Sequence, residues 1–315
     1  MGAWNSGAVG STRYRGLAYD SARWEHFELR AGDVVISTPP KCGTTWTQMI
    51  CALLVFQEPD LPAPLATLSP WIDMLLRPRG EVFADLGAQR HRRFIKTHTP
   101  LDGLPVRPDV TYVCTGRDPR DVAVSLDHHL DNFDVGLALE RRAAVAAADG
   151  LDPAALLPPR DRPSDRLERF WRWVDDETPV TESGSTLRYT LHHLRSFWDA
   201  PDELDVVLLH YDDLAGDLAG AMRRLADHLG IAVPEELWPR LVRAATFDEM
   251  RARPEVTAPG ADRGQWKDPT AFFRKGTSGQ WRELLDDEAR QRYATAMQGL
   301  VPADLSAWLH RPALA

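Results

Sequence analysis

The chain has 315 residues, of which 43% are hydrophobic, and a formal net charge of −9 at pH 7. A chain of this length can bury a large core, and we expect residues 1–315 to form a single domain. The acidic balance disfavours nucleic acid as a partner, and no apolar run is long enough to cross a bilayer. Three scattered cysteines without C-x-x-C spacing favour neither a zinc site nor disulfides, which is typical of a cytoplasmic protein.

Strand-like and helical segments alternate along the chain. Strands are expected near residues 33–38, 93–96, 110–115 and 205–210. Helices are expected over 44–56, 119–130, 165–176, 185–199 and 217–229, the last beginning at Asp217 and ending at Gly230. This alternation predicts an α/β fold with a central parallel sheet flanked by helices, in which ligands bind at the carboxyl ends of the strands.

The first strand leads into a candidate anion site, the run Ser37-Thr38-Pro39-Pro40-Lys41-Cys42-Gly43-Thr44-Thr45-Trp46. The first N–H groups of a helix lack internal partners, and the helix dipole favours negative charge there. Lys41 adds a mobile cation, so a phosphate-like group is the expected ligand. The strand-loop-helix order is P-loop-like, but Lys41 precedes Gly43, whereas a Walker loop places its lysine after glycine.

The third strand leads into a second candidate anion site, Gly116-Arg117-Asp118-Pro119-Arg120-Asp121-Val122-Ala123-Val124-Ser125. Asp118 suits the N-cap of a helix and Pro119 its first position. Arg117 is then held at the junction of strand and helix, with the Ser125 hydroxyl two turns further on. An arginine fork beside a hydroxyl suits a second phosphate.

Together with Phe273-Arg274-Lys275-Gly276-Thr277-Ser278-Gly279-Gln280-Trp281, these runs resemble the nucleotide-binding motifs of the cytosolic-type sulfotransferases. Cys42, Asp118 and Gln280 replace the usual Ser, Asn and Asp of that family. The resemblance implies a bacterial enzyme that takes a sulfuryl group from 3′-phosphoadenosine 5′-phosphosulfate (PAPS). It implies that the 5′-phosphosulfate is held by the loop residues Lys41, Cys42, Gly43, Thr44 and Thr45, and the 3′-phosphate by Arg117, Ser125, Arg274, Lys275 and Gly276.

The resemblance extends to the adenine and to the catalytic groups. Trp46 and Phe247 match adenine-side aromatics, while a further tyrosine contact, with Tyr189 as the nearest residue, is left open. The run Arg93-Phe94-Ile95-Lys96-Thr97-His98-Thr99-Pro100 matches the family's K-T-H-x-P. Imidazole suits the deprotonation of a hydroxyl acceptor, so the match implies His98 as general base, with Lys96 as a supporting cation. Lys41 would stabilise the leaving group, and no metal is required.

The acceptor is expected to be a small, apolar compound with a hydroxyl group. Irregular stretches at 59–80, 131–163 and 253–270 follow the N-terminal segment 1–30 and are expected to cover the acceptor or the cofactor. They and their surroundings supply candidate apolar wall residues: Trp71, Ile72, Met74, Leu75, Leu76, Phe83, Phe133, Leu137 and Leu139. Neither of the first two stretches has the clustered lysines that a sugar-chain acceptor would require.

Several alternatives stay open on the sequence alone. The pairs His128-His129 and His192-His193 lack acidic or thiol partners at ligand spacing, so they are expected at the surface or at helix ends and not at a metal. Residues 282–289 do not match the short C-terminal dimer segment of the family, which leaves the oligomeric state undecided. The competing functions are a nucleotide kinase with a P-loop-like site and an inactive nucleotide-binding regulator.

Overall fold

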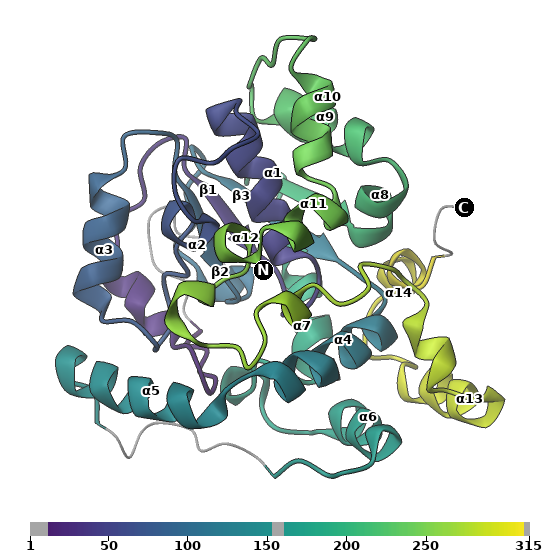
Figure 1. The fold of residues 1–315 in the computed structure, drawn as a ribbon. Coiled ribbons are helices and arrows are strands. Elements are labelled where there is room, and N and C mark those ends of the chain that lie inside the picture. Colours follow the sequence, from purple (N-terminus) through teal and green to yellow (C-terminus); the bar gives the residue numbers. More distant parts are fainter. Residues whose placement is uncertain (1–11, 153–160, 312–315) are drawn as a thin grey trace.

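Four parallel strands form the centre of the molecule, in the order β2-β1-β3-β4 (Figure 1). The computed structural model describes residues 12–152 and 161–311. The strands are β1 (Val34–Ser37), β2 (Phe94–Thr97), β3 (Thr111–Gly116) and β4 (Val206–His210). All four lie within a residue or two of the expected segments, and the predicted α/β fold with a central parallel sheet is confirmed.

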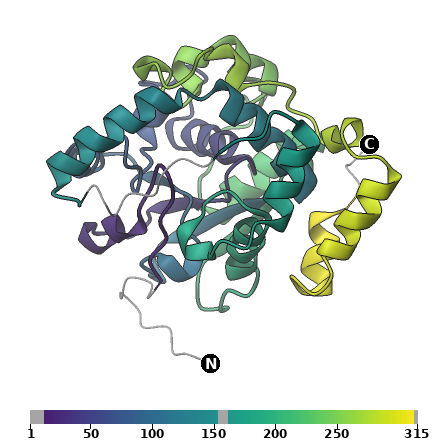
Figure 2. The ribbon, with the colours of Figure 1, turned by 90° about the horizontal axis from the view of Figure 1, so that it is seen from below.

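Helices occupy most of the chain between and after the strands. They are α1 (Thr44–Phe56), α2 (Leu65–Leu68), α3 (Arg79–Ala88), α4 (Pro119–Asn132), α5 (Val135–Asp149), α6 (Arg166–Asp175), α7 (Leu187–Trp198), α8 (Tyr211–Gly216), α9 (Leu218–His228), α10 (Trp238–Ala244), α11 (Phe247–Ala252), α12 (Pro254–Thr257), α13 (Asp287–Ala296) and α14 (Ala303–Leu309). Helix α5 and the α13–α14 pair lie at opposite ends of the molecule (Figures 1 and 2).

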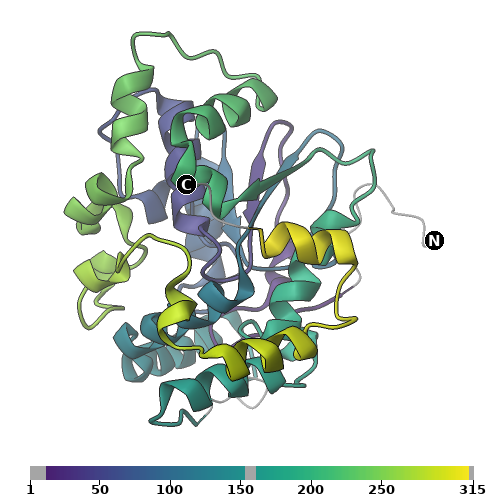
Figure 3. The same ribbon diagram turned by 90° about the vertical axis from the view of Figure 1, so that its right-hand side faces the viewer.

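The alternation of side chains along the strands divides the core into two layers. Val34 and Ile36 pack with residues of α1, α9 and α10 on one face of the sheet. Val35 and Tyr112 pack with residues of α4, α6 and α7 on the other face, where α13 and α14 also contribute. Figure 3 shows α13 running beside α6, which extends this second layer to the C-terminal end of the chain.

Local capping signals start and stop the helices where the sequence predicts. Asp118 caps α4 by accepting a hydrogen bond from the Arg120 N–H at 2.9 Å, and Pro119 takes the first helical position. Asp217 caps α9 through the Gly220 N–H at 2.8 Å. Gly230 follows the end of α9 with φ of 66°, a left-handed conformation that favours glycine.

The three irregular stretches contain helices as well as loops. Residues 59–80 hold α2, and residues 131–163 hold the 15-residue helix α5. Residues 153–160 of this second stretch lie outside the described residues. Residues 253–270 hold the four-residue helix α12 and then run to the junction of α4 and α5, where Trp266 forms a bridge with Phe133.

Candidate active site

The carboxyl edge of the sheet brings three distant loops together. Lys41 follows β1, His98 follows β2 and Arg117 follows β3, and all three line one cavity of about 350 Å³. The same cavity is lined by ten further residues that the sequence singled out: Gly43, Thr44, Thr45, Trp46, Lys96, Ser125, Phe247, Arg274, Lys275 and Gly276. Cys42 is the exception among the predicted residues, because its side chain is fully buried in the core and contributes no surface to the cavity.

The loop between β1 and α1 is shaped as an anion cradle. Lys41 and Gly43 both have positive φ values, of 70° and 103°. Holding a residue other than glycine in such a conformation costs about 1–3 kcal/mol, a strain found at functional sites. No side chain caps the N-terminus of α1, so the first N–H groups of this 13-residue helix are available to an anion.

Two lysines share the cavity with no negative partner. Burial, with the nearby Arg117 and Lys96, lowers the pKa of Lys41 to about 7. Burial also lowers the pKa of Lys96 to about 8, although the carboxylate of Asp73 acts in the opposite direction. Among the described residues, neither ammonium forms a salt bridge, and Lys96 instead lies 4.7 Å from the centre of the Trp71 ring. A bound anion would restore the usual charge of both lysines.

His98 is held in the tautomer that a general base needs. Its Nδ1 lies 2.7 Å from the backbone oxygen of Thr38, which can only accept, so Nδ1 carries the proton and Nε2 keeps its lone pair. The edge of Trp71 packs on the imidazole at 4.7 Å between ring centres. Burial and the charge of Lys96 lower the pKa of His98 to about 3, so the ring is neutral near pH 7.

Arg117 and Arg274 supply a second cationic region. Arg117 is 4% exposed, lies over the ring of Tyr211 at 4.1 Å and donates to the backbone oxygens of Lys41 and Thr277 at 3.2 and 3.0 Å. Its Nε has no hydrogen-bond partner among the described residues. Arg274 donates to the side-chain oxygen of Gln280. In the described chain neither guanidinium has a carboxylate within salt-bridge distance, so both can bind an anion.

The loop of Arg274 is fastened to α4 by a buried carboxylate. Asp121 accepts hydrogen bonds from the backbone N–H groups of Gly279 and Gln280 at 2.6 and 2.8 Å. Gly276 has φ of 68°, and a Cβ there would lie 2.5 Å from the ring of Phe247. The C-terminal motif therefore closes against both α4 and an aromatic side chain, which explains why it needs glycine at this position.

Tyr211 is a cavity residue that the sequence reasoning missed. Its ring lies 5.4 Å from that of Trp46, whose indole N–H donates to the Ala245 oxygen at 2.8 Å. Phe247 lines the same side of the cavity. Tyr211 directly follows β4, so its place at the carboxyl end of a strand was the available signal. Tyr189 is elsewhere: it is fully buried and donates to the backbone oxygen of His98.

The expectation for the histidine pairs is wrong at His193, which lies inside α7 and is completely buried, with its Nε2 2.9 Å from the hydroxyl of Ser37. His129 lies in the last turn of α4, as expected for a helix end, and it also lines the cavity, where its Nδ1 lies 3.2 Å from the ammonium of Lys41. Polarity alone suggested the surface for His193, whereas the Ser37 hydroxyl provides a partner inside the fold. Within residues 12–152 and 161–311, no three His, Cys, Asp or Glu side chains are placed to hold a metal ion.

The apolar side of the cavity is only partly the one expected. Trp71, Met74 and Phe133 line it, as the sequence suggested. The other expected wall residues do not line it: Ile72, Leu75 and Leu76 are buried elsewhere in the core, and Phe83, Leu137 and Leu139 also lie outside the lining. Trp266 and Phe272 complete the wall and were missed. They pack against His129 at 4.8 and 6.1 Å between ring centres.

Comparison with known proteins identifies the family. Residues 31–309 match the sulfotransferase domain, and the chain belongs to this family, as the motifs implied. It is 42% identical over 306 residues to a glycolipid sulfotransferase of Mycobacterium bovis, covering 94% of this chain and 93% of the relative. It is 29% identical over 293 residues to bovine sulfotransferase 1A1, covering 87% and 86% of the two chains.

Solved structures share the fold. Retinol dehydratase in a complex with retinol and PAP aligns with a TM-score of 0.66 at 24% identity, covering 90% of this chain and 85% of that one. Mouse sulfotransferase SULT7A1 complexed with PAP also aligns with a TM-score of 0.66, at 18% identity, covering 92% of both chains. In the part of the chain that the structure describes, no helix is both long and apolar enough to cross a membrane.

The lowered pKa of Lys41 predicts pH-dependent anion binding. Below about pH 7 the ammonium is already charged, whereas above it the side chain must take up a proton before it can hold an anion. Affinity for inorganic pyrophosphate should therefore fall as the pH rises from 7 to 9, by up to about tenfold per unit. Calorimetry in two buffers of different ionisation enthalpy measures the proton uptake. Lys41→Gln should reduce that uptake and the exposed Lys267→Gln should not; uptake that Lys41→Gln leaves unchanged contradicts the assignment.

Proposed function

We propose that this sulfotransferase moves the sulfuryl group of PAPS in line to a hydroxyl of an amphipathic, lipid-bearing acceptor, with His98 as general base. The observation that carries the proposal is the set of four cations at one cavity, Lys41, Lys96, Arg117 and Arg274, none of which has a carboxylate partner among the described residues. Two separated groups of positive charge suit a donor with two separated phosphates.

The donor fits the residues in three places. The N-terminus of α1, with Lys41, Thr44 and Thr45, would hold the 5′-phosphosulfate. The 3′-phosphate would be held by Arg117, Ser125, Arg274, Lys275 and Gly276, and the adenine by Trp46, Tyr211 and Phe247. The unpartnered Nε of buried Arg117 is a donor that such a phosphate would satisfy. The PAP in the related structures supports the same donor.

The transfer step then follows from the placement of His98. Its Nε2 takes the proton of the acceptor hydroxyl as the oxygen forms a bond to sulfur. The bond between sulfur and the bridging oxygen breaks, and the electron pair stays on that oxygen, where Lys41 stabilises the developing charge. Lys96 balances the charge of the sulfuryl oxygens. Negative charge beside the two lysines raises the pKa of His98 from about 3, which makes the imidazole a stronger base when the donor is bound.

The acceptor proposal rests on the apolar wall and on the relatives. The apolar wall of the cavity consists of Trp71, Met74, Phe133, Trp266 and Phe272. At its rim lies Leu130, 38% exposed and the one large apolar side chain of the described residues that is exposed to this degree. A lipid chain could leave the cavity over such a side chain. The 42% identical relative is a glycolipid sulfotransferase, which supports a sugar hydroxyl at the reacting end.

All three irregular stretches contribute to the cavity. Ser69 and Trp71 come from residues 59–80, Phe133 from 131–163 and Trp266 from 253–270. This supports their proposed roles as acceptor and cofactor walls of a single catalytic domain. The mycobacterial relatives and the free, buried cysteines support a bacterial, cytoplasmic setting. The alternative of a nucleotide kinase is less well supported, because the sequence has no lysine at the Walker position and the described residues contain no acidic cluster placed to hold a metal ion.

The donor assignment predicts a strong preference for a 3′-phosphate. 3′-Phosphoadenosine 5′-phosphate (PAP) should bind much more tightly than AMP, since each charge-assisted contact is typically worth about 1.5–3 kcal/mol. Arg117→Gln should reduce that preference, while Arg240→Gln, on exposed surface outside the cavity, should not. Calorimetry that gives equal affinities for PAP and AMP in the wild-type protein would sink the assignment.

The assignment of the base predicts a selective loss of turnover. His98→Ala should lower kcat by roughly a hundredfold or more and leave PAP affinity nearly unchanged, because His98 holds no phosphate. His192→Ala is the matched control, because His192 follows no motif and does not line the cavity. Near-normal turnover of His98→Ala with labelled PAPS would move the role of base to another residue, and His129 is then the first to test.

The acceptor proposal predicts that activity depends on a lipid chain. With labelled PAPS, dodecyl glucoside should be sulfated with at least about tenfold higher kcat/KM than methyl glucoside, since burying each additional CH₂ contributes about 0.8 kcal/mol. Phe133→Ala should narrow this difference. A phenol, a sterol and a glycosaminoglycan complete the panel; sulfation of the polysaccharide alone would contradict an apolar, amphipathic acceptor.

A further inference from the structure

Arginines from helix α6 and the loop before it converge on one carboxylate of helix α4. Arg162 and Arg169 each approach the carboxylate of Asp127 to 2.5 Å. Arg166 is more distant, at 3.6 Å from Asp127 and 3.7 Å from Asp131. The short contacts of these carboxylates therefore go to the other two arginines, and Arg166 has the longest ion pairs of the three.

Arg166 also approaches His128. Its two terminal nitrogens lie 3.3 and 3.1 Å from the two ring nitrogens of His128. A guanidinium can only donate and a neutral imidazole has a single acceptor nitrogen, so Arg166 donates to one of the two ring nitrogens and His128 is uncharged. Burial, together with Arg274 and Arg166, lowers the pKa of His128 to about 4, in agreement with a neutral ring. Arg166 therefore keeps its full charge, with a neutral residue in front of it.

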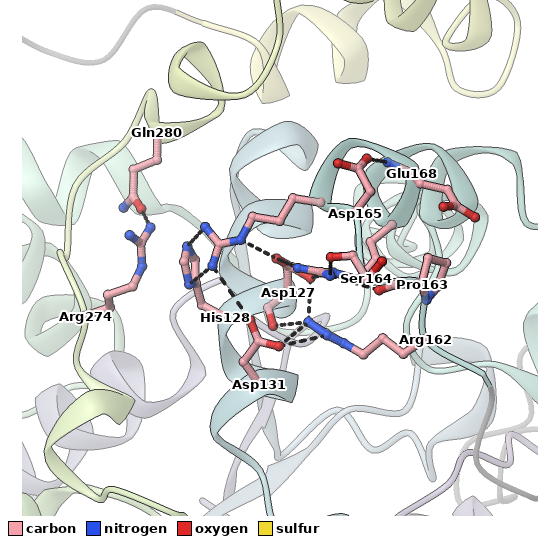
Figure 4. Close-up of polar contacts among 12 residues, drawn as sticks. Asp127, His128, Asp131, Arg162, Pro163, Ser164, Asp165, Glu168, Arg274 and Gln280 are labelled. Carbon is pink, nitrogen blue, oxygen red and sulfur yellow. Dashed lines mark hydrogen bonds and ion pairs between the residues drawn. The ribbon is translucent and has the colours of Figure 1, made fainter.

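His128 belongs to the wall of the candidate 3′-phosphate site. It follows Ser125 by three residues on α4, so the two side chains lie on the same face one turn apart. Both line the cavity, together with Arg117 and Arg274. Figure 4 shows His128 between Arg274 on one side and the carboxylates of Asp127 and Asp131 on the other. Arg166 is not part of the cavity lining, but its guanidinium lies against His128, which is.

Arg166 and Arg274 are close enough to influence one another. Burial lowers the pKa of Arg274, Glu283 raises it, and the positive charges of Arg166 and Arg117 lower it further. Arg274 has no carboxylate partner among the described residues, and the carboxylate of Glu283 is bound by Lys275 at 2.8 Å. Like charges gathered in this way repel each other, and a doubly charged phosphate between them would relieve the repulsion.

We propose that the positive charge of Arg166, supplied by α6 and held against His128 and the Asp127 network, strengthens the binding of the 3′-phosphate of the donor from behind the cavity wall. The inference rests on the proposed function, because it assumes a nucleotide with a phosphate at the 3′ position. The side chain of Arg166 is 50% exposed, so we expect it to contribute a few-fold to the affinity for the nucleotide, less than buried Arg117 contributes.

The test compares PAP and AMP on each variant by calorimetry at low salt. Arg166→Gln should weaken PAP about three- to tenfold and leave AMP within twofold of the wild-type value. The matched control is Arg172→Gln, on the same helix and 53% exposed, whose partner is Glu168 at 3.8 Å; it should change neither affinity. A double variant with Arg274→Gln should show coupling for PAP and none for AMP.

The outcomes separate this inference from the proposed function. Equal binding of PAP and AMP by the wild-type protein overturns both. A wild-type preference for PAP that Arg166→Gln leaves intact, or an equal loss of PAP and AMP, overturns the role of Arg166 alone and makes the arginine cluster purely structural. If Arg166→Gln does not fold, Arg166→Lys replaces it: because the charge is kept, at least half of the wild-type PAP-to-AMP affinity ratio should remain, and a larger loss overturns the inference.

Discussion

The structure depends on positive charge that the protein itself does not neutralise. Parallel strands place their carboxyl ends at one edge, and there Lys41, Lys96, Arg117 and Arg274 share a cavity without a carboxylate in salt-bridge distance among the described residues. Burying charge in this way is unfavourable in the empty protein, as the lowered pKa values of both lysines show. An anionic ligand removes that penalty, so a chain with a net charge of −9 can still attract one.

The buried carboxylate of Asp73 forms no ion pair with Lys96, so the charge of this lysine stays available to a ligand. Asp73 is fully buried close to Lys96, yet its Oδ2 accepts hydrogen bonds from the hydroxyls of Thr97 and Thr99, at 2.5 and 2.6 Å, and from the indole of Trp24 at 3.2 Å. It therefore orders both neighbours of His98 in the chain and supports the charge of Lys96 from a distance. A direct ion pair would instead have occupied the ammonium that the site presents to its ligand.

The sequence predicted the features that depend on residues close together in the chain. The strands, the start of α1 and the cap at Asp118 depend on residues a few positions apart, and all three appear as expected. Trp266 reaches the cavity only through the packing of the loop before α13, which no local pattern encodes, whereas Tyr211 follows the predicted strand β4 and could have been found from that position. Tyr189 shows the same limit of local reasoning. Its position in the sequence made it the nearest residue for a tyrosine contact with the adenine, whereas the fold buries it against the backbone of His98.

Lys41 lies at the boundary between the charged and the apolar halves of the cavity. Its ammonium is 3.2 Å from the Nδ1 of His129 and 4.9 Å from the centre of the Phe272 ring, both on the apolar side. An anion at the N-terminus of α1 would share this ammonium with His129, because an ammonium group has three N–H donors. Occupancy of the anion site and the surface offered to an acceptor are thereby linked through a single side chain. The backbone strain at Lys41 is consistent with this double role, since the turn holds the lysine where the two halves meet.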